Sequence, residues 1–210
     1  MQRNESDKIE TQLKEWLPDF SVLEPHLEIA TGTPLALQKE KNLKEFADHY
    51  RLEGKDTRAL IVGRFQPPHA GHLYLIEASL AIADQVVIGI GSANIIDEKN
   101  PFAPAYRERV LRHALVKQGI DPKRVTFIQL DDLGDNEEWG DMTYKKASKD
   151  GAISAVIGNS DWVNGIFETE KFKDLGVKVC RPKKLGRGLF NSTRLRDMFR
   201  TALELRPIGK

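Results

Sequence analysis

Two histidines separated by an alanine and a glycine, His69 and His72, are the residues of this chain best suited to chemistry on an anion. They follow Ala59–Val62, a short apolar run rich in β-branched residues, which is typical of a strand buried on both faces of a parallel sheet. From Gly71 onward apolar residues recur at helical spacing, which places His69 on the loop and His72 in the first helical turn. We therefore expect both imidazoles beside free backbone N–H groups at a helix start and at the carboxyl edge of a strand, a geometry that suits a phosphate.

The loop before these histidines is stiff, because Pro67 and Pro68 fix their own φ angles and cannot continue a strand. Gly71 removes a side chain that would block the close approach of a ligand. A lone histidine near a helix start is more often a surface residue than a catalyst, so the hypothesis depends on the combination of arginine, prolines and paired histidines. The string GRFQPPHAGH resembles the H-x-G-H signature of the nucleotidyltransferase superfamily and, within it, the G-R-F/M-Q-P-F-H-x-G-H string of archaeal-type nicotinamide-nucleotide adenylyltransferases. The residues that this resemblance implies at the ATP site are Gly63, Arg64, Phe65 and Gly71.

The composition limits the remaining function classes. A chain of 210 residues can bury one sizeable α/β core with a small appendage, and a net charge of +1 indicates neither a nucleic-acid nor a membrane partner. The single cysteine, Cys180, excludes an internal disulfide framework and a cysteine metal site, and it fits a reducing compartment. No apolar run is long enough to span a bilayer and the polar, charged start is unlike a signal peptide, so we expect a soluble cytoplasmic protein.

The chain divides into two parts at residue 58. Residues 1–57 contain no strand-like run: Ile9–Leu17 forms an amphipathic stripe and a second helix is expected between Pro34 and Gly54, so we predict a helical extension packed on the domain or on a neighbouring subunit. Over residues 58–210 strand-like and helix-like segments alternate, which predicts an α/β fold, a Rossmann-like open parallel sheet with helices on both faces. The expected strands are Ala59–Val62, Val86–Ile90, Val125–Leu130, Ile153–Ile157 and Val177–Val179. The expected helices of this domain are His72–Ala83, Ala105–Gln118, Asn136–Asp150, Trp162–Lys173 and Ser192–Leu205.

Ligands of open parallel sheets bind beyond the carboxyl ends of the strands, so the residues after each strand should converge. The second strand is followed by a glycine-containing loop that lets backbone N–H groups approach a ligand, although a plain loop with a helix cap also explains it. The resemblance implies that Ser92 and Asn94 contact nicotinamide mononucleotide. Aligned without a gap, it also makes Arg107, rather than Arg109, the phosphate-binding arginine.

Acidic residues follow the third strand. Such a run is usually a solvated loop or a metal site, yet Trp139 at the next helix start offers a flat face on which a cationic pyridinium ring stacks with cation–π support. The resemblance implies that Asp132, Asn136 and Trp139 hold nicotinamide mononucleotide, because the family carries an aspartate and then Asn-x-x-Trp. A Trp139 that merely fills the core is the competing interpretation.

Small polar residues follow the fourth strand and precede the last helix. Gly158 and Asn159 resemble the G-N pair at the family's nucleotide-binding edge, and the nearby Trp162 either contacts a ligand or packs. Near the chain end, Asn-Ser-Thr places capping groups at another helix start, and Arg196 follows Thr193 by about one turn. The stretch resembles the superfamily's second signature, I-S-x-T-x-x-R, with an asparagine where serine is usual. The further ATP-site residues implied are Gly158, Asn159, Asn191, Ser192 and Thr193.

Together these groups predict a polyphosphate site, with Mg²⁺ shared among phosphate oxygens and no metal site of the protein's own. The chain lacks the strings G-x-x-x-x-G-K-[ST] and G-x-G-x-x-G, which argues against γ-phosphoryl transfer and hydride chemistry. With ATP as donor and nicotinamide mononucleotide as acceptor, the acceptor's phosphate attacks the α-phosphorus in line and gives NAD and pyrophosphate, so catalysis reduces to alignment and charge. The predicted catalytic residues are His69 and His72, which donate to the triphosphate, and Arg196, at the β- and γ-phosphates.

Other functions remain open at the level of sequence. The same superfamily includes enzymes with other acceptors, such as phosphopantetheine, FMN or a phosphorylated alcohol with CTP. A non-catalytic nucleotide sensor would use residues 1–57 as a partner-binding arm. A class I aminoacyl-tRNA synthetase relative is disfavoured, because the chain lacks a K-M-S-K-S-like loop. The family resemblance also favours a homo-oligomer.

Overall fold

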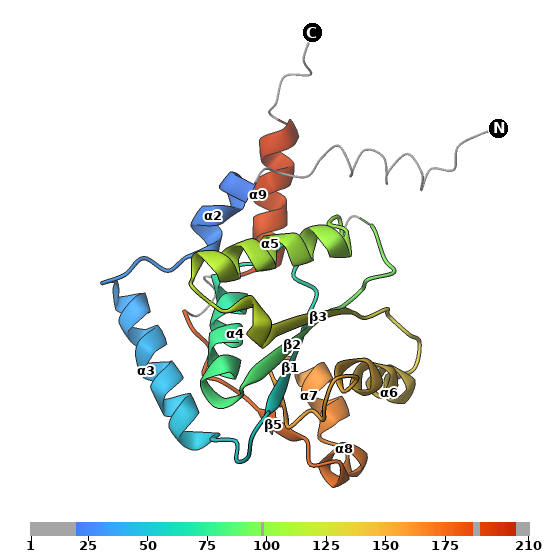
Figure 1. The fold of residues 1–210 in the computed structure, drawn as a ribbon. Helices are drawn as coiled ribbons and strands as arrows, with labels where there is room; N and C mark the ends of the chain where they lie inside the picture. The colour runs from blue at the N-terminus through green and yellow to red at the C-terminus, as the bar shows by residue number, and fades with distance from the viewer. Residues whose placement is uncertain (1–19, 98, 187–189, 205–210) are drawn as a thin grey trace, which may run out of the picture.

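The structure, a computed structural model, describes residues 20–97, 99–186 and 190–204. Within these ranges five parallel strands form one sheet in the order β3-β2-β1-β4-β5. The strands are β1 (Arg58–Gly63), β2 (Gln85–Ile90), β3 (Val125–Gln129), β4 (Ala155–Ile157) and β5 (Lys178–Cys180). The predicted Rossmann-like open parallel sheet is confirmed (Figure 1).

Helices cover both faces of this sheet. They are α2 (Phe20–Leu27), α3 (Pro34–His49), α4 (Ala70–Ile82), α5 (Pro104–Lys117), α6 (Asn136–Ala147), α7 (Asp161–Phe167), α8 (Glu170–Asp174) and α9 (Ser192–Glu204), with a 3₁₀ turn η1 (Pro122–Arg124) before β3. Successive residues of a strand point to opposite faces, so Ile61 of β1 packs with the core that includes α4 and α5, while Leu60 packs with the core that includes α6, α7 and α8. The buried β1 at the centre of the sheet, predicted from its apolar run, is confirmed.

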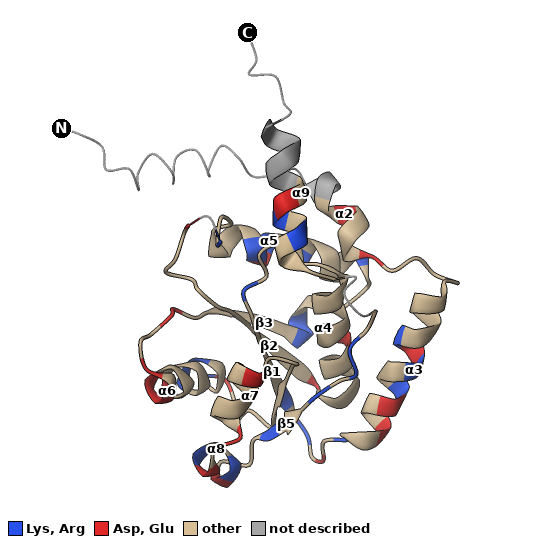
Figure 2. Cartoon of the chain, turned by 180° about the vertical axis from the view of Figure 1, so that it is seen from behind, with Lys and Arg blue, Asp and Glu red and all other residues tan. Residues whose placement is uncertain are grey.

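The described part of the N-terminal extension packs on the α4 and α5 side of the sheet. Leu23, Leu27 and Phe46 are buried in the same core as β1, and Lys39 of α3 forms a 2.8 Å ion pair with Glu77 of α4. The predicted second helix of the extension is therefore confirmed as α3, whereas the stripe Ile9–Leu17 lies outside the described residues. Acidic and basic side chains alternate along α3 and α8 (Figure 2), as the near-zero net charge leads one to expect.

Two differences from the predicted elements have local causes. The helix α2 was not among the predicted elements; it contains Pro25, which cannot donate within a helix, but burial of Leu23 and Leu27 one turn apart favours the helix. The single helix expected over 162–173 is divided into α7 and α8, because the backbone turns extended at Thr169, the N-cap residue of α8, whose hydroxyl donates to the Ile166 carbonyl (3.0 Å). In the described part of the chain, no helix has the length and apolar character needed to cross a membrane.

Candidate active site

The carboxyl ends of β1, β2 and β3 meet the start of α7 around a cavity of about 510 Å³, here called the edge cavity. Backbone and side chains of Gly63, Arg64, Ser92, Asp132 and Trp139 line it, together with Trp162. All but the last were predicted from the sequence as nucleotide-binding residues. The structure thus brings the ends of these strands together, as the functional hypothesis requires.

His69 and His72 form a stacked pair at the start of α4. His69 is the N-cap residue and His72 the third residue of the helix, and their ring centroids lie 3.7 Å apart at an interplanar angle of 25°. The backbone N–H of His69 donates to Nδ1 of His72 at 3.2 Å. Because Nδ1 accepts, this hydrogen bond assigns the proton of neutral His72 to Nε2, which becomes a donor.

Burial keeps both imidazoles neutral. It lowers the pKa of His69 to about 4 and lowers the pKa of His72 well below its usual range, with the neighbouring His69 adding to the effect on His72. Nδ1 of His69 is buried without a hydrogen-bond partner in the described part of the chain. At neutral pH the pair therefore provides hydrogen bonds without adding positive charge.

Two residues predicted to contact ATP instead support the imidazoles. Phe65 is 1% exposed with φ of +50°, and its ring lies 4.8 Å from that of His72. A Cβ on Gly71 would lie 3.0 Å from Cβ of Phe190 and 3.1 Å from the His69 ring. The missing side chain of Gly71 thus makes room for protein groups beside His69, and a ligand contact at Gly71 stays a prediction.

The start of α9 reaches back to the histidine loop. Arg196 donates to the Gln66 carbonyl (2.5 Å) and to Oγ1 of Thr193 (2.9 Å), which confirms that these two side chains share a helix face. Ser192 donates its hydroxyl to the Pro67 carbonyl at 3.0 Å. Oδ1 of Asn191 accepts from the backbone N–H of Thr193 at 2.8 Å, so the asparagine supplies the helix cap. The imidazoles and the C-terminal guanidinium thus lie at one edge of the sheet.

Arg107, predicted as a phosphate-binding residue, is buried among loop carbonyls. Its side chain is fully buried, and its terminal nitrogens donate to the carbonyls of Arg64 (2.6 Å), Gly91 (2.7 Å) and Ser92 (3.2 Å). Burial lowers the pKa of Arg107 to about 10, with the charge of Asp132 opposing the shift. The guanidinium therefore ties together the loops after β1 and β2 rather than facing a phosphate. Arg64 is exposed and lines the edge cavity.

The predicted contacts on the loops after β2 and β3 bond to one another. The Asp132 carboxylate accepts from the backbone N–H of Ser92 (3.2 Å) and from its hydroxyl (2.8 Å). Asn94 accepts from the Asp132 N–H at 2.9 Å and donates to its carbonyl at 3.3 Å. The structure thus brings these residues together, but their polar groups fix the relative positions of two loops.

The predicted ring-binding residue, Trp139, is 2% exposed and lies at the floor of the edge cavity. Its ring centroid is 4.6 Å from that of Trp162, at 48°. Asn136 does not line the edge cavity; its Oδ1 accepts from Nε1 of Trp162 at 3.0 Å, beside a second cavity. Gly158 and Asn159 follow β4 as expected, and the Gly158 carbonyl accepts from the buried side chain of Asn164 (3.1 Å).

Sequence reasoning missed Gln66. Its buried side-chain amide donates to the Phe102 carbonyl and accepts from the Phe102 N–H, both at 3.0 Å. This pairing joins the histidine loop to the segment before α5. The spacing of residues in the sequence does not predict this contact, because both partners lie in loops. In the ranges that the structure describes, no three His, Cys, Asp or Glu side chains are grouped to hold a metal ion.

Residues 60–179 match the sequence pattern of the family described as cytidylyltransferase-like. The nicotinamide-nucleotide adenylyltransferase of Caldivirga maquilingensis is 36% identical over 144 residues, which are 68% of this chain and 76% of that protein. The proteins of the same name from Pyrobaculum aerophilum and Pyrococcus horikoshii are 36% and 34% identical, over 67% and 66% of this chain and 75% and 70% of theirs.

Among solved structures, the bifunctional NMN adenylyltransferase/ADP ribose pyrophosphatase of Francisella tularensis superposes with a TM-score of 0.63 at 27% identity over 70% of this chain. A second structure of that protein, complexed with AMP and a manganese ion, gives a TM-score of 0.56 at 30% identity over 69% of this chain. In both cases this chain spans 42% of the bifunctional protein's length.

Proposed function

The chain belongs to the nicotinamide-nucleotide adenylyltransferases of the cytidylyltransferase-like family, and from that premise we propose that it transfers the adenylyl group of ATP to nicotinamide mononucleotide, releasing pyrophosphate and forming NAD. The observation that supports this activity best is that the stacked His69 and His72 lie at the start of α4, beside the start of α9, and follow the strand β1 whose carboxyl end lines the edge cavity with Trp139.

The chain's own residues act by alignment and charge. The phosphate of nicotinamide mononucleotide is already an anionic nucleophile, so no side chain has to remove a proton from it. Nε2–H of His72 donates to the triphosphate as negative charge develops on the α-phosphate, and the helix around it fixes its direction. His69 and Arg196 complete the contacts to the triphosphate, and Arg64 binds phosphate from the edge cavity.

ATP enters as its magnesium complex, a substrate whose metal is held by phosphate oxygens. One finding supports this: a relative's structure contains a divalent ion together with AMP. A cytoplasmic location is proposed with it, supported by the free buried thiol of Cys180. We also propose a homo-oligomer, which light scattering after size exclusion would test.

The activity is tested by mixing the protein with ATP, Mg²⁺ and nicotinamide mononucleotide and coupling NAD to alcohol dehydrogenase. We expect turnover, and a loss of roughly 100-fold or more in kcat for His72→Ala, the size found when one donor to a developing anion is removed. His49→Ala, which changes an exposed histidine of α3, is the matched control and should behave like the parent. ATP binding without pyrophosphate release would instead indicate a nucleotide sensor.

A further inference from the structure

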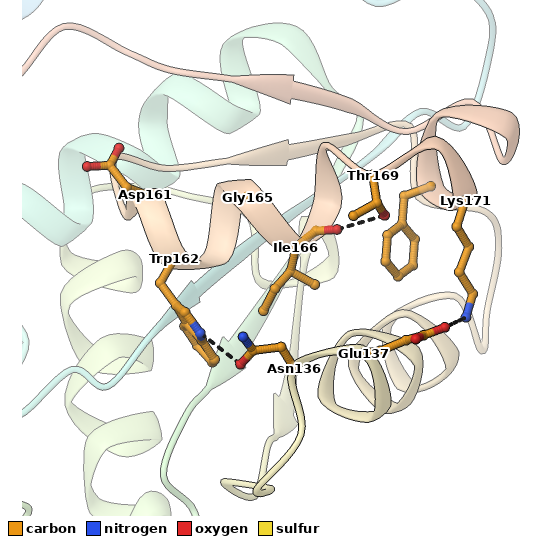
Figure 3. A pocket seen from close by; sticks show the side chains of 9 residues that line it. Asn136, Glu137, Asp161, Trp162, Gly165, Ile166, Thr169 and Lys171 are labelled. Atoms are coloured by element: carbon orange, nitrogen blue, oxygen red, sulfur yellow. Dashed lines mark hydrogen bonds and ion pairs between the residues drawn. The ribbon is translucent and has the colours of Figure 1, made fainter.

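Trp162 stands between two cavities. It is 51% exposed and lines the edge cavity together with Trp139. It also lines a cavity of about 590 Å³ between α6, α7 and α8, here called the side cavity, whose apolar wall includes Ile166 and Phe172 (Figure 3). The half-exposed ring of Trp162 therefore offers a large apolar face to whatever occupies the edge cavity.

The indole of Trp162 is held in place although it is half exposed. Figure 3 shows the side chains of Asn136 and Trp162 pointing toward one another from α6 and α7, joined by the 3.0 Å bond from Nε1 to Oδ1. The rings of Trp162 and Trp139 lie 4.6 Å apart at a 48° tilt, and both line the edge cavity. A planar group bound in that cavity therefore touches both indoles without separating them.

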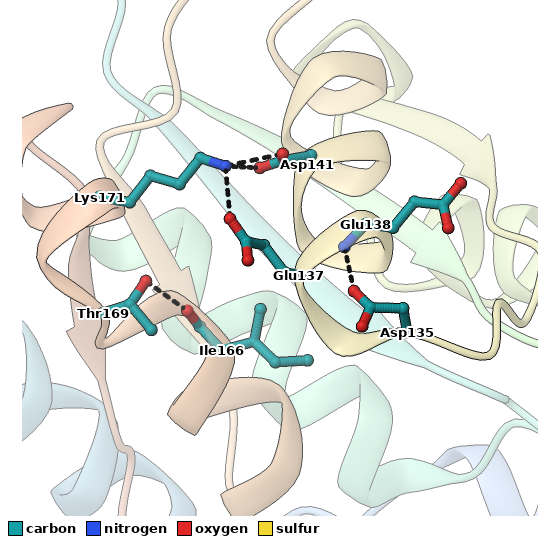
Figure 4. A network of polar contacts seen from close by, with 7 residues as sticks. All are labelled: Asp135, Glu137, Glu138, Asp141, Ile166, Thr169 and Lys171. Atoms are coloured by element: carbon teal, nitrogen blue, oxygen red, sulfur yellow. Dashed lines mark hydrogen bonds and ion pairs between the residues drawn. The ribbon is translucent and has the colours of Figure 1, made fainter.

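Asn136, which accepts the hydrogen bond of the Trp162 indole, is itself held in place. Asn136 is the first residue of α6, where Asp135 caps the helix by accepting from the N–H of Glu138 at 2.8 Å. Lys171 of α8 bridges Glu137 and Asp141 of α6, with its ammonium 3.5 Å and 2.6 Å from their carboxylates (Figure 4). The start of α6 is thereby tied to the α7 and α8 segment that carries Trp162.

We propose that Trp162 is a second ring-binding residue for the pyridinium of the acceptor, and that Asn136 is a positioning residue that acts through the Trp162 indole. The inference rests on the proposed function. A pyridinium ring is cationic, and an indole face is the strongest aromatic partner for a cation. Trp139 supplies the buried floor and Trp162 the exposed wall, so the site selects a flat cation over a neutral alcohol or thiol acceptor.

The test measures initial rates with ATP and nicotinamide mononucleotide varied in turn. Trp162→Ala should raise KM for nicotinamide mononucleotide about tenfold, as expected for one lost aromatic and cation–π contact, while KM for ATP stays within about twofold. Trp162→Phe, which keeps a ring, should recover most of the loss. An unchanged KM for the acceptor in Trp162→Ala would overturn the assignment.

A double-variant cycle separates the role of Asn136 from direct substrate contact. Asn136→Ala should raise KM for the acceptor in the parent protein but add nothing in the Trp162→Phe background, because phenylalanine has no N–H for Asn136 to hold. An equal effect in both backgrounds would mean that Asn136 touches the substrate itself. Glu138→Gln is the control, because this side chain of α6 is exposed and the variant keeps the backbone N–H that Asp135 accepts from; it should match the parent.

The two proposals fail in different ways. A parent protein that neither binds nicotinamide mononucleotide in titration calorimetry nor forms NAD refutes the proposed function and this inference together. A parent that forms NAD while Trp162→Ala keeps its KM for the acceptor refutes only the inference.

Discussion

Replacing Arg107 with methionine removes a buried charge and leaves loop carbonyls without their donor. The Ser92 carbonyl also accepts from the N–H of Ile95 at 3.4 Å, so the carbonyls of Arg64 and Gly91 bear most of the loss. Each buried acceptor left unsatisfied costs roughly 1–3 kcal/mol, partly offset because a charge no longer has to be buried. We expect Arg107→Met to lower the free energy of unfolding by about 3 kcal/mol.

The measurement is thermal unfolding followed by circular dichroism, with urea unfolding as a second method. For a chain of this size, about 3 kcal/mol corresponds to a fall in Tm of roughly 6–12 °C. Since Arg107 holds the loops that carry Arg64 and Ser92, kcat/KM for both substrates should fall as well. Arg109→Met is the matched control: this exposed arginine lies two residues on, over the Tyr106 ring at 5.8 Å, and its loss should shift Tm by much less.

One result would refute the positioning role of Arg107. If Arg107→Met unfolds at the parent's Tm yet loses activity, its guanidinium is not needed to hold the loops. The arginine would then bind phosphate, as the sequence alone predicted. A fall in Tm that free ATP does not reverse, together with higher KM values, supports the structural assignment.

Three more outcomes follow from the site. The folded pKa of His69 lies at about 4, below its unfolded value, so the unfolded chain binds more protons between about pH 6.5 and 4. The free energy of unfolding that this group contributes is therefore full above that window and falls as the pH drops, by about 2 kcal/mol at pH 5. In urea unfolding, His69→Asn should make this fall shallower. Gly71→Ala should lower stability by about 1–3 kcal/mol and reduce kcat, because its methyl group meets Phe190 and the His69 ring; parent-like unfolding would contradict the packing argument. Cys180 is buried and burial raises its pKa to about 11, so iodoacetamide should label it only after unfolding, as mass spectrometry would show.

The part of the site set by local sequence was predictable. Helical spacing after Gly71 places His72 in the first turn of α4, and the spacing of Thr193 and Arg196 places them on one face of α9; both are confirmed. Parallel strands with apolar runs made the convergence of their carboxyl ends a general expectation of the fold. These features depend on periodicity and capping, which a single sequence contains.

The part of the site set by distant contacts was not predictable. Arg107 occupies a position in the first turn of α5 that suits a surface or phosphate-binding arginine, and only the approach of two loops shows that it is buried. In the same way, spacing cannot tell whether Gly71 leaves room for a ligand or for Phe190. Asn136 has the residue type and spacing of a ligand contact, yet its partner is an indole from another helix.

The features of the site that the sequence did not predict share a physical cause. A phosphate site has to hold its donors to a fraction of an ångström, so much of its polar surface bonds to protein rather than to ligand. Here Arg107, Gln66 and the pair of Ser92 and Asp132 join the loops after β1, β2 and β3, whereas His72 bonds to the backbone through Nδ1 and keeps its proton on Nε2. Substitutions of Arg107, Gln66, Ser92 or Asp132 should therefore lower the free energy of unfolding and raise KM together. His72→Asn places an amide oxygen where His72 has its Nδ1 acceptor, so it should reduce kcat while leaving Tm nearly unchanged. Measuring kcat, KM and Tm for His72→Asn and Arg107→Met side by side tests this division of roles.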